Sequence, residues 1–322
     1  MSEALVIGGT GAMGGSVVLR LLEATSDDVL VLTRDPDSPR AERLADLGGG
    51  RVRLLRGDVG DPATLHEGLE LVDAVFCNTD FFSTGSVVGE YEQGLAILDA
   101  ARAANVDRFV WSSLDHAAVL TGGRLPVPHY DGKGAVAAHI GLRRSDEVMR
   151  RETDGWYSRH VSVLTTAPYF ENFPSRLAPR PGRLPDGREG LLFEIPLGSG
   201  RYPLIGLDDI AWFAVHVLDR WETWGGRDLA VAADSLTGEQ IAAAFERVTG
   251  TPAAYVPVPL DAVRAGDPDF GHDFAAMFEF FATRDLVGLD RDLPALRDLH
   301  PGLLSFEDWL RTSGWDGTRR DG

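Results

Sequence analysis

A glycine-rich segment near the start of the chain, Gly8-x-x-Gly11-x-x-Gly14, could bind a phosphate group. It lies between the apolar run 4–7 and a segment whose apolar residues recur at helical spacing. Glycines at such a junction allow a tight turn and bring backbone N–H groups and a helix N-terminus close to a pyrophosphate. This context favours a dinucleotide site over an ordinary glycine-rich turn.

An arginine follows the second apolar run, in the order Leu32-Thr33-Arg34-Asp35. NAD-specific sites normally offer a carboxylate to the ribose 2′-hydroxyl at this point. A guanidinium there can bind a 2′-phosphate through two hydrogen bonds, so Arg34 predicts NADP(H), with Thr33 and Arg40 assisting. The alternative is a solvated Arg34 with Asp35 turned back to the ribose.

Lysine is almost absent from the composition. Of the 31 basic residues only Lys133 is a lysine, and the other 30 are arginines. An exposed position could carry arginine, so this lysine indicates a site that needs a compact ammonium instead of a planar fork. His129 and Tyr130 precede it at distances that allow a shared helix face, and either side chain could donate a proton. The alternative is that both side chains merely cover a helix start.

The elements that must position these residues alternate between short apolar strands and amphipathic helices. Strands are predicted at 4–7, 29–32, 52–55, 74–77, 109–111 and 161–164. The clearest helix spans 90–104, with Tyr91, Leu95 and Leu98 on one face, and a long helix is expected over about 134–151. The alternation implies an α/β fold of the Rossmann type, with a doubly wound parallel sheet.

The second half of the chain changes character at Pro168. Residues 168–203 are rich in proline and glycine, and Thr237 and Gln240 form a capping-box pattern before a helix at 241–248. Asp208 and Asp209 are expected to cap a helix at 210–220. We therefore expect an NAD(P)-binding Rossmann domain at 1–167, completed by about 202–234. A smaller mixed α/β region at 168–201 and 235–322 would bind a substrate or partner.

The charge and composition of the chain argue against several classes of function. The formal net charge of −18 argues against binding to nucleic acid, and no run is long enough to cross a membrane. Cys77 is the only cysteine, which excludes an internal disulfide, and its place in an apolar run predicts a small buried hydrophobe. The first residues do not read as a signal peptide, so a cytoplasmic protein is expected. The histidines lack metal-ligand spacing, and no metal is predicted.

These motifs together resemble the NmrA-like family, a group of atypical short-chain dehydrogenase/reductases with NADPH-sensing members. The resemblance runs through 6–17, Leu32-Thr33-Arg34, Gly57-Asp58, 109–114, 129–134 and 169–172, and more weakly through 275–280 and 305–310. Its specific segments are His-x-Asp-Gly-Lys-Gly at 129–134 and Tyr-Phe-Glu-Asn at 169–172. The chain departs from the pattern at Glu92, at Tyr130 and in a ten-residue insertion at 142–151.

The resemblance implies the roles of individual residues. Together with the motifs above, it predicts a set of residues that line NADP(H): Gly8, Gly9, Thr10, Gly11, Ala12, Met13, Gly14, Thr33, Arg34, Asp58, Val59, Thr79, Asp80, Phe81, Lys133, Tyr169, Phe170, Glu171 and Asn172. Asp58 is placed to meet the adenine, or alternatively to begin a helix. Ordinary short-chain dehydrogenases carry a tyrosine where His129 stands, four residues before the lysine. Ser113 matches their substrate-orienting serine, with a loop cap as the alternative.

Two functions follow from these predictions. The first is an NADPH-dependent reductase of a small organic acceptor such as an enone, quinone, carbonyl or imine. Its catalytic residues would be Lys133, His129 or Tyr130, and Ser113, with Tyr169 to Asn172 and the following loop closing the pocket. The second is an NADPH/NADP sensor that regulates a partner protein without chemistry, which the missing Tyr-x-x-x-Lys pattern suggests. The oligomeric state stays open.

Overall fold

The computed structural model describes residues 3–320, which form two compact units. The first unit combines Met1–His116, Pro128–Thr165 and Ile210–Leu229, and the second combines Ala117–Val127, Thr166–Asp209 and Ala230–Gly322. The roles expected for the two parts of the chain, cofactor binding and substrate or partner binding, stay predictions.

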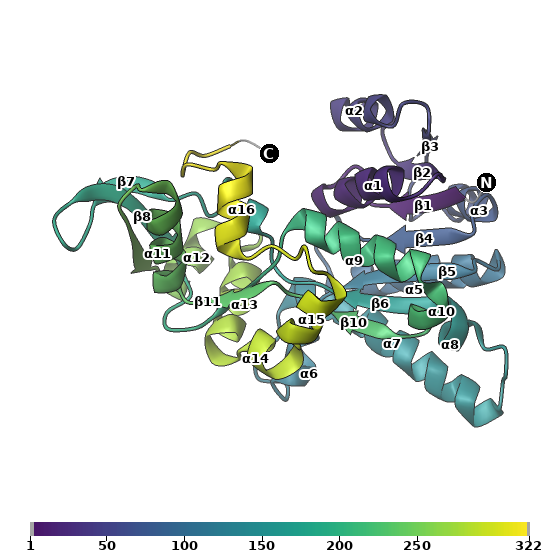
Figure 1. The fold of residues 1–322 in the computed structure, drawn as a ribbon. Coiled ribbons are helices and arrows are strands. Elements are labelled where there is room, and N and C mark those ends of the chain that lie inside the picture. The colour runs from purple at the N-terminus through teal and green to yellow at the C-terminus, as the bar shows by residue number, and fades with distance from the viewer. Residues whose placement is uncertain (1–2, 321–322) are drawn as a thin grey trace. The chain divides into compact units, whose positions relative to one another are not determined.

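A seven-stranded sheet forms the centre of the first unit, in the order β10-β6-β5-β4-β1-β2-β3 (Figure 1). Its strands are β1 (Glu3–Ile7), β2 (Asp28–Thr33), β3 (Val52–Arg56), β4 (Ala74–Cys77), β5 (Arg108–Ser113), β6 (Val161–Thr165) and β10 (Asp228–Ala230). All pairings from β3 across to β6 are parallel. The apolar runs of β1 and β4 are buried throughout, as strands covered on both faces require. The predicted Rossmann-type sheet is confirmed.

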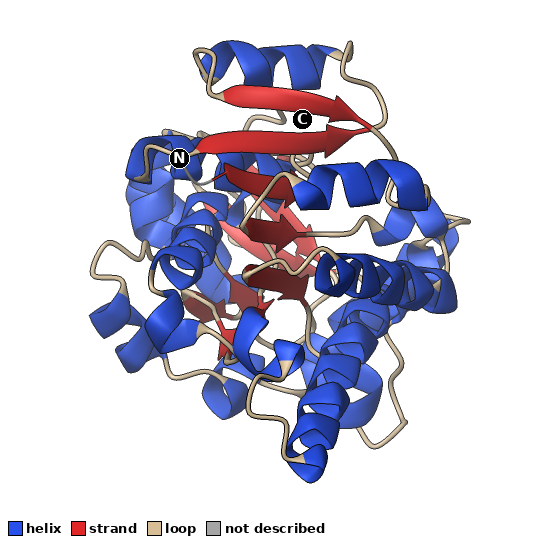
Figure 2. Ribbon diagram, turned by 90° about the vertical axis from the view of Figure 1, so that its right-hand side faces the viewer, coloured by secondary structure: helices blue, strands red, loops and turns tan. Residues whose placement is uncertain are grey.

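Helices cover both faces of this sheet (Figure 2). They are α1 (Ala12–Ala24), α2 (Pro39–Leu47), α3 (Pro62–Glu70), α4 (Phe81–Thr84), α5 (Val87–Ala103), α7 (Pro128–Arg150), α8 (Trp156–His160), α9 (Leu207–Asp219) and α10 (Trp221–Trp224). Helix α5 packs against α3 and α7. Within the described part of the chain, no helix combines the length and apolarity needed to cross a membrane.

Two helices differ from the sequence prediction in ways that bear on the site. The buried face of α5 carries Glu90, Gly94, Ile97, Leu98 and Ala101, whereas Tyr91 and Leu95 are only partly buried. Tyr91 and Leu95 pack against the same core as the buried Leu98, so the predicted face is present, and the structure adds the Glu90 carboxylate to the buried side of the helix. Helix α7 begins at Pro128, so the whole segment 129–134 lies within its first turns.

The second unit holds two small sheets surrounded by short helices. Its elements are α6 (Ala117–Leu120), η1 (Phe170–Asn172), β7 (Arg180–Arg183), β8 (Glu189–Ile195), β9 (Tyr202–Leu204), β11 (Asp234–Leu236), α11 (Gly238–Thr249), β12 (Ala253–Pro257), α12 (Leu260–Gly266), α13 (Gly271–Thr283), α14 (Leu286–Asp290), α15 (Leu293–Leu299) and α16 (Phe306–Ser313). Strands β12 and β8 pair in parallel, while β7 with β8 and β9 with β11 pair antiparallel. The predicted smaller mixed region is confirmed.

Two helices in the second half of the chain, α9 and α11, have N-termini for which the sequence predicts capping residues. The capping box of Thr237 and Gln240 is present at α11, as predicted. The prediction for Asp208 and Asp209 was wrong in position, because α9 starts at Leu207 and both aspartates lie in its first turn. Asp209 Oδ1 lies 2.9 Å from His300 Nε2, a contact between residues far apart in the sequence.

Candidate functional site

The strand order reverses between β1 and β4, which is the point where open α/β sheets bind ligands. Strand β1 has β4 on one side and β2 on the other, so the chain leaves these carboxyl ends toward opposite faces of the sheet. The two loops touch: the backbone N–H of Asn78 donates to Ile7 O at 3.1 Å. Gly8 takes φ +81°, and a Cβ there would lie 2.3 Å from Asn78 O. Only glycine fits this junction.

The N-terminus of α1 fits an anion. Its N-cap is Gly11, and among the described residues no side chain caps it. The first N–H groups of a helix have no partner within the helix, so those of α1 remain available to a phosphate. Gly14 allows the first turn to lie against the β1 loop, since a Cβ there would stand 2.1 Å from Gly8 O. The predicted glycine motif thus forms a cradle that a pyrophosphate fits.

The end of β2 presents an unpaired guanidinium. The guanidinium of Arg34 is exposed and has no hydrogen-bond or ion-pair partner within residues 3–320. Asp35 accepts from the N–H of Asp37 at 3.2 Å, so its carboxylate is engaged in its own loop. The guanidinium of Arg56, at the end of β3, donates to Arg34 O at 3.3 Å and pairs with Asp37 at 2.7 Å.

Arg56 was missed by sequence reasoning. It lies opposite Thr33 in the parallel register of β2 and β3. A prediction of that register could have found it, since the carboxyl ends of parallel strands meet at one edge. Asp58 follows on the next turn and accepts from Gly60 N at 2.7 Å, while Asp61 caps α3 by accepting from Ala63 N. The helix-entry role weighed for Asp58 therefore belongs to Asp61.

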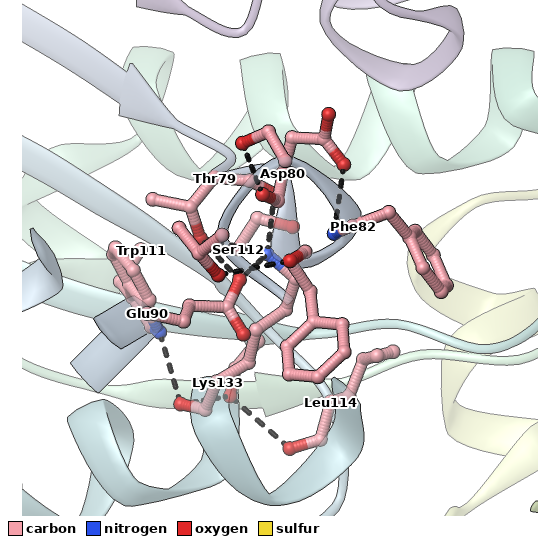
Figure 3. A network of polar contacts seen from close by, with 12 residues as sticks. Thr79, Asp80, Phe82, Glu90, Trp111, Ser112, Leu114 and Lys133 are labelled. Carbon is pink, nitrogen blue, oxygen red and sulfur yellow. Dashed lines mark hydrogen bonds and ion pairs between the residues drawn. The ribbon is translucent and has the colours of Figure 1, made fainter. Parts of the chain in front are cut away.

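Lys133 lies at the centre of a buried polar network in the first unit (Figure 3). Its Nζ donates to Thr79 O at 2.6 Å and Thr79 Oγ1 at 2.8 Å, and pairs with Glu90 Oε1 at 2.9 Å. Thr79 Oγ1 in turn donates to Glu90 Oε1 at 2.7 Å. Lys133 is 8 % exposed and Glu90 is fully buried. The only lysine of the chain therefore joins the end of β4 to helices α5 and α7.

The other predicted catalytic residues surround the start of α7. The rings of His129 and Tyr130 meet edge to face at 4.8 Å, and His129 also faces Phe82 at 5.6 Å. Ser113 is buried, and its hydroxyl lies 3.1 Å from Leu114 O and 3.2 Å from Lys133 O. These contacts hold the backbone at the start of α7. The roles of His129, Tyr130 and Ser113 in chemistry remain predictions.

Two further predicted residues lie beside the network. Asp80 accepts from Phe82 N at 3.2 Å and thereby caps the short helix α4, and Phe81 is buried.

The thiol of Cys77, at the end of β4, is fully buried, which raises its pKa to about 12. It therefore stays protonated and acts as a small hydrophobe, as the sequence predicts.

The segment Tyr169 to Asn172 lies in the second unit and contacts other residues there. Phe170 is fully buried, and its ring lies 5.6 Å from those of Phe306 and Trp309. Glu171 accepts from Leu207 N and from Trp309 Nε1, both at 3.1 Å. Burial raises the pKa of Glu171 to about 7, and these hydrogen bonds lower it only in part. Burial likewise raises the pKa of Tyr169 to about 12, so its hydroxyl stays neutral.

Glu171 makes the stability of the protein depend on pH. Its carboxyl titrates near 4.5 when unfolded and at about 7 when folded, so the folded state holds more protons between these values. The stability that the protonated carboxyl contributes is complete below its unfolded pKa of 4.5 and is lost as the pH rises through its folded pKa of about 7. Glu171→Gln should remove this loss, which amounts to about 2 kcal/mol after allowance for partial exposure. Urea unfolding at about pH 5 and about pH 8 measures it; equal losses in wild type and variant would contradict the assignment.

The chain is similar in sequence to known proteins. The sequence matches the NmrA-like family over residues 1–310. Among curated proteins it is similar to the NmrA-like family domain-containing oxidoreductase hkm9 of Aspergillus hancockii, with 28% identity over 261 residues, covering 79% of this chain and 74% of that protein.

Solved structures share the fold. One is NmrA, described as a negative transcriptional regulator, in complex with NAD, with a TM-score of 0.75, 18% identity and 98% of each chain covered. NmrA has also been solved in complex with NADP, with a TM-score of 0.73. Another is the Citrobacter sp. triphenylmethane reductase complexed with NADP(H), with a TM-score of 0.72, 19% identity and coverage of 96% of this chain and 99% of that chain. At these identities the likeness concerns the fold.

Proposed function

The chain belongs to the NmrA-like family, and from this premise we propose that it is an NADPH-dependent reductase of a small organic acceptor. The acceptor classes are enones, quinones, carbonyls and imines. One observation carries the proposal: the only lysine is fixed at the carboxyl end of β4, beside a glycine cradle that fits a pyrophosphate. Relatives named oxidoreductases and neighbours solved with NAD or NADP support it.

Different residues of the first unit would bind different parts of the dinucleotide. The open N–H groups of α1 would hold the pyrophosphate. Arg34 would bind the 2′-phosphate, assisted by Arg40, which follows it in the chain, and by Arg56, which contacts its backbone from β3. The bound dinucleotide would supply the hydride. Lys133 would bind the nicotinamide ribose, and His129 or Tyr130 would donate the proton that the reduced acceptor needs. Tyr169 to Asn172 and the second unit would contribute to binding of the substrate or partner.

Turnover tests the proposal. Purified protein that binds NADPH should oxidise it in the presence of at least one acceptor from a panel of enones, quinones, carbonyls and imines, and Lys133→Ala should abolish that oxidation. Absence of turnover with every acceptor, from protein shown to bind NADPH, would overturn the reductase proposal.

A second function is an NADPH/NADP sensor that regulates a protein partner. The observation in its favour is that a histidine, His129, stands four residues before Lys133, where ordinary short-chain dehydrogenases carry tyrosine. A sensor would change its partner affinity or oligomeric state when NADP replaces NADPH, with no acceptor present. Steady turnover that depends on Lys133 would exclude a purely non-catalytic sensor.

Arg34 should determine the preference for NADPH over NADH. Arg34→Ala should weaken NADPH binding by about 10-fold to 100-fold, because a hydrogen bond to a charged group contributes about 1.5–3 kcal/mol. NADH has no 2′-phosphate, so its dissociation constant should stay nearly unchanged. Calorimetric titration with both nucleotides measures the difference.

The matched control for Arg34 is Arg150→Ala, which removes an exposed arginine at the end of α7 and should alter neither affinity. If Arg34→Ala weakened NADPH and NADH equally, Arg34 would not recognise the 2′-phosphate. Arg56→Ala should cause a smaller loss for NADPH alone, because its guanidinium is already paired with Asp37.

A further inference from the structure

A buried carboxylate next to Lys133 has no role in the function proposed above. Glu90 lies in the first turn of α5 and is 0 % exposed. Its Oε1 accepts from Thr79 Oγ1 and pairs with Lys133 Nζ, while its Oε2 has no hydrogen-bond partner in the described part of the chain. A buried carboxylate must be compensated by a charge or by hydrogen bonds, and here a single oxygen receives both.

The ammonium of Lys133 already has three close partners in the protein. An ammonium has three N–H groups. Two of them donate to Thr79 O at 2.6 Å and to Thr79 Oγ1 at 2.8 Å, and the charged group also pairs with Glu90 Oε1 at 2.9 Å (Figure 3). A ribose hydroxyl that approaches Lys133 Nζ competes with these partners. The bond to Thr79 Oγ1 is the one most readily exchanged, because that hydroxyl keeps its own hydrogen bond to Glu90.

The neighbouring helix is shaped around this carboxylate. A Cβ on Gly132 would lie 2.5 Å from Glu90 Oε2, so a larger residue before Lys133 would have to displace this carboxylate. Gly94, one turn after Glu90, also lies close to α7, since a Cβ there would lie 2.6 Å from Val136 Cγ2. Two glycines on facing helices therefore accommodate the pair of Glu90 and Lys133.

We propose that Glu90 is a positioning residue for Lys133. Resting on the proposed function, the inference is that Glu90 holds the ammonium and the Thr79 hydroxyl at the end of β4, and that Lys133 exchanges its bond to Thr79 Oγ1 for a hydroxyl of the nicotinamide ribose. Glu90 touches neither the acceptor nor the dinucleotide. Its contribution is the location and charge compensation of the side chain that does.

The single lysine allows a direct spectroscopic test. Protein grown with lysine labelled with ¹³C at Cε and ¹⁵N at Nζ has one labelled side chain, Lys133, and so one ε-CH₂ signal. NADPH should shift this signal in the wild type. In Glu90→Gln, which keeps the shape but loses the charge, the signal should move before any cofactor is added. The NADPH dissociation constant should rise about tenfold, as the loss of a charge-assisted hydrogen bond predicts.

The matched control is Glu92→Gln, two residues further along α5, where the carboxylate is exposed. It should leave both the signal and the affinity as in the wild type. If Glu90→Gln does not fold, Glu90→Asp keeps the charge but withdraws it by one methylene, and it should move the signal and weaken NADPH by a smaller factor. A lysine signal or an NADPH affinity that neither Glu90 variant changes more than Glu92→Gln would overturn the inference.

The same spectra separate this inference from the proposed function. If NADPH binds to the wild type without shifting the Lys133 signal, the proposed contact of Lys133 with the ribose is wrong, and with it the exchange at Thr79 Oγ1. A signal that still responds to Glu90→Gln would then establish the pair as structural only. If the signal responds to both NADPH and Glu90→Gln while no acceptor is reduced, the positioning role holds and the reductase proposal fails.

Discussion

Gly14→Ala should nearly abolish NADPH binding, with a dissociation constant at least about 100-fold higher than that of the wild type. The added Cβ would lie 2.1 Å from Gly8 O and 2.6 Å from Gly8 C, both backbone atoms. Neither can rotate away, so the start of α1 must move from the β1 loop, and the N–H groups that would hold the pyrophosphate move with it. Overpacking of this kind should also lower the free energy of unfolding by about 3 kcal/mol.

Gly15→Ala is the matched control, because the next residue of α1 faces a different environment. A Cβ at Gly15 would meet Gly9 O at 3.4 Å, an ordinary contact. Alanine is favoured over glycine within a helix by about 1 kcal/mol, so this variant should be as stable as the wild type or slightly more stable. Calorimetric titration with NADPH and urea unfolding of the two variants measure the contrast. Equal NADPH affinities for Gly14→Ala and the wild type would show that the cradle does not hold the pyrophosphate.

Lys133→Met should lower the free energy of unfolding by about 3–5 kcal/mol, because it leaves the Glu90 carboxylate buried without a counter-charge. The variant should also lose most of its NADPH affinity, since the ribose would lose its only cationic donor. Urea unfolding measures the stability, and titration of folded protein with NADPH measures the affinity. A variant as stable as the wild type would show that Glu90 is neutral or otherwise compensated.

Lys133→Arg distinguishes the need for charge from the need for a compact ammonium. Three acceptor atoms converge on one nitrogen within 2.6–2.9 Å, and a planar guanidinium cannot place its N–H groups on all three. Lys133→Arg should therefore also be destabilised and bind NADPH weakly. Arg150→Ala, which breaks a surface pair with Asp146 at the far end of the same helix, should change stability by less than about 1 kcal/mol. Wild-type behaviour of Lys133→Arg would mean that lysine is retained here without a steric reason.

Local pattern was sufficient for the strands, the glycine motif and the family. The six parallel strands predicted from apolar runs are present, since residues buried on both sheet faces must be apolar along the whole strand. The tight approach at Gly14 is also a local effect, because Gly8 and Gly14 are separated by a single turn. The composition alone singled out Lys133, because one lysine among 31 basic residues is visible without any structure.

The partners of these residues depend on how distant segments pack. Glu90 lies on the buried face of α5, because Lys133 of α7 and Thr79 after β4 compensate its charge there. Those residues are 43 and 11 positions away in the chain, and no periodicity within one helix records them. Arg56 reaches the Arg34 loop only through the register of β2 and β3. The sequence thus determined which residues could do chemistry, whereas the packing of α5, α7 and the parallel strands determined their partners, because a buried charge is stabilised by whatever the fold places beside it.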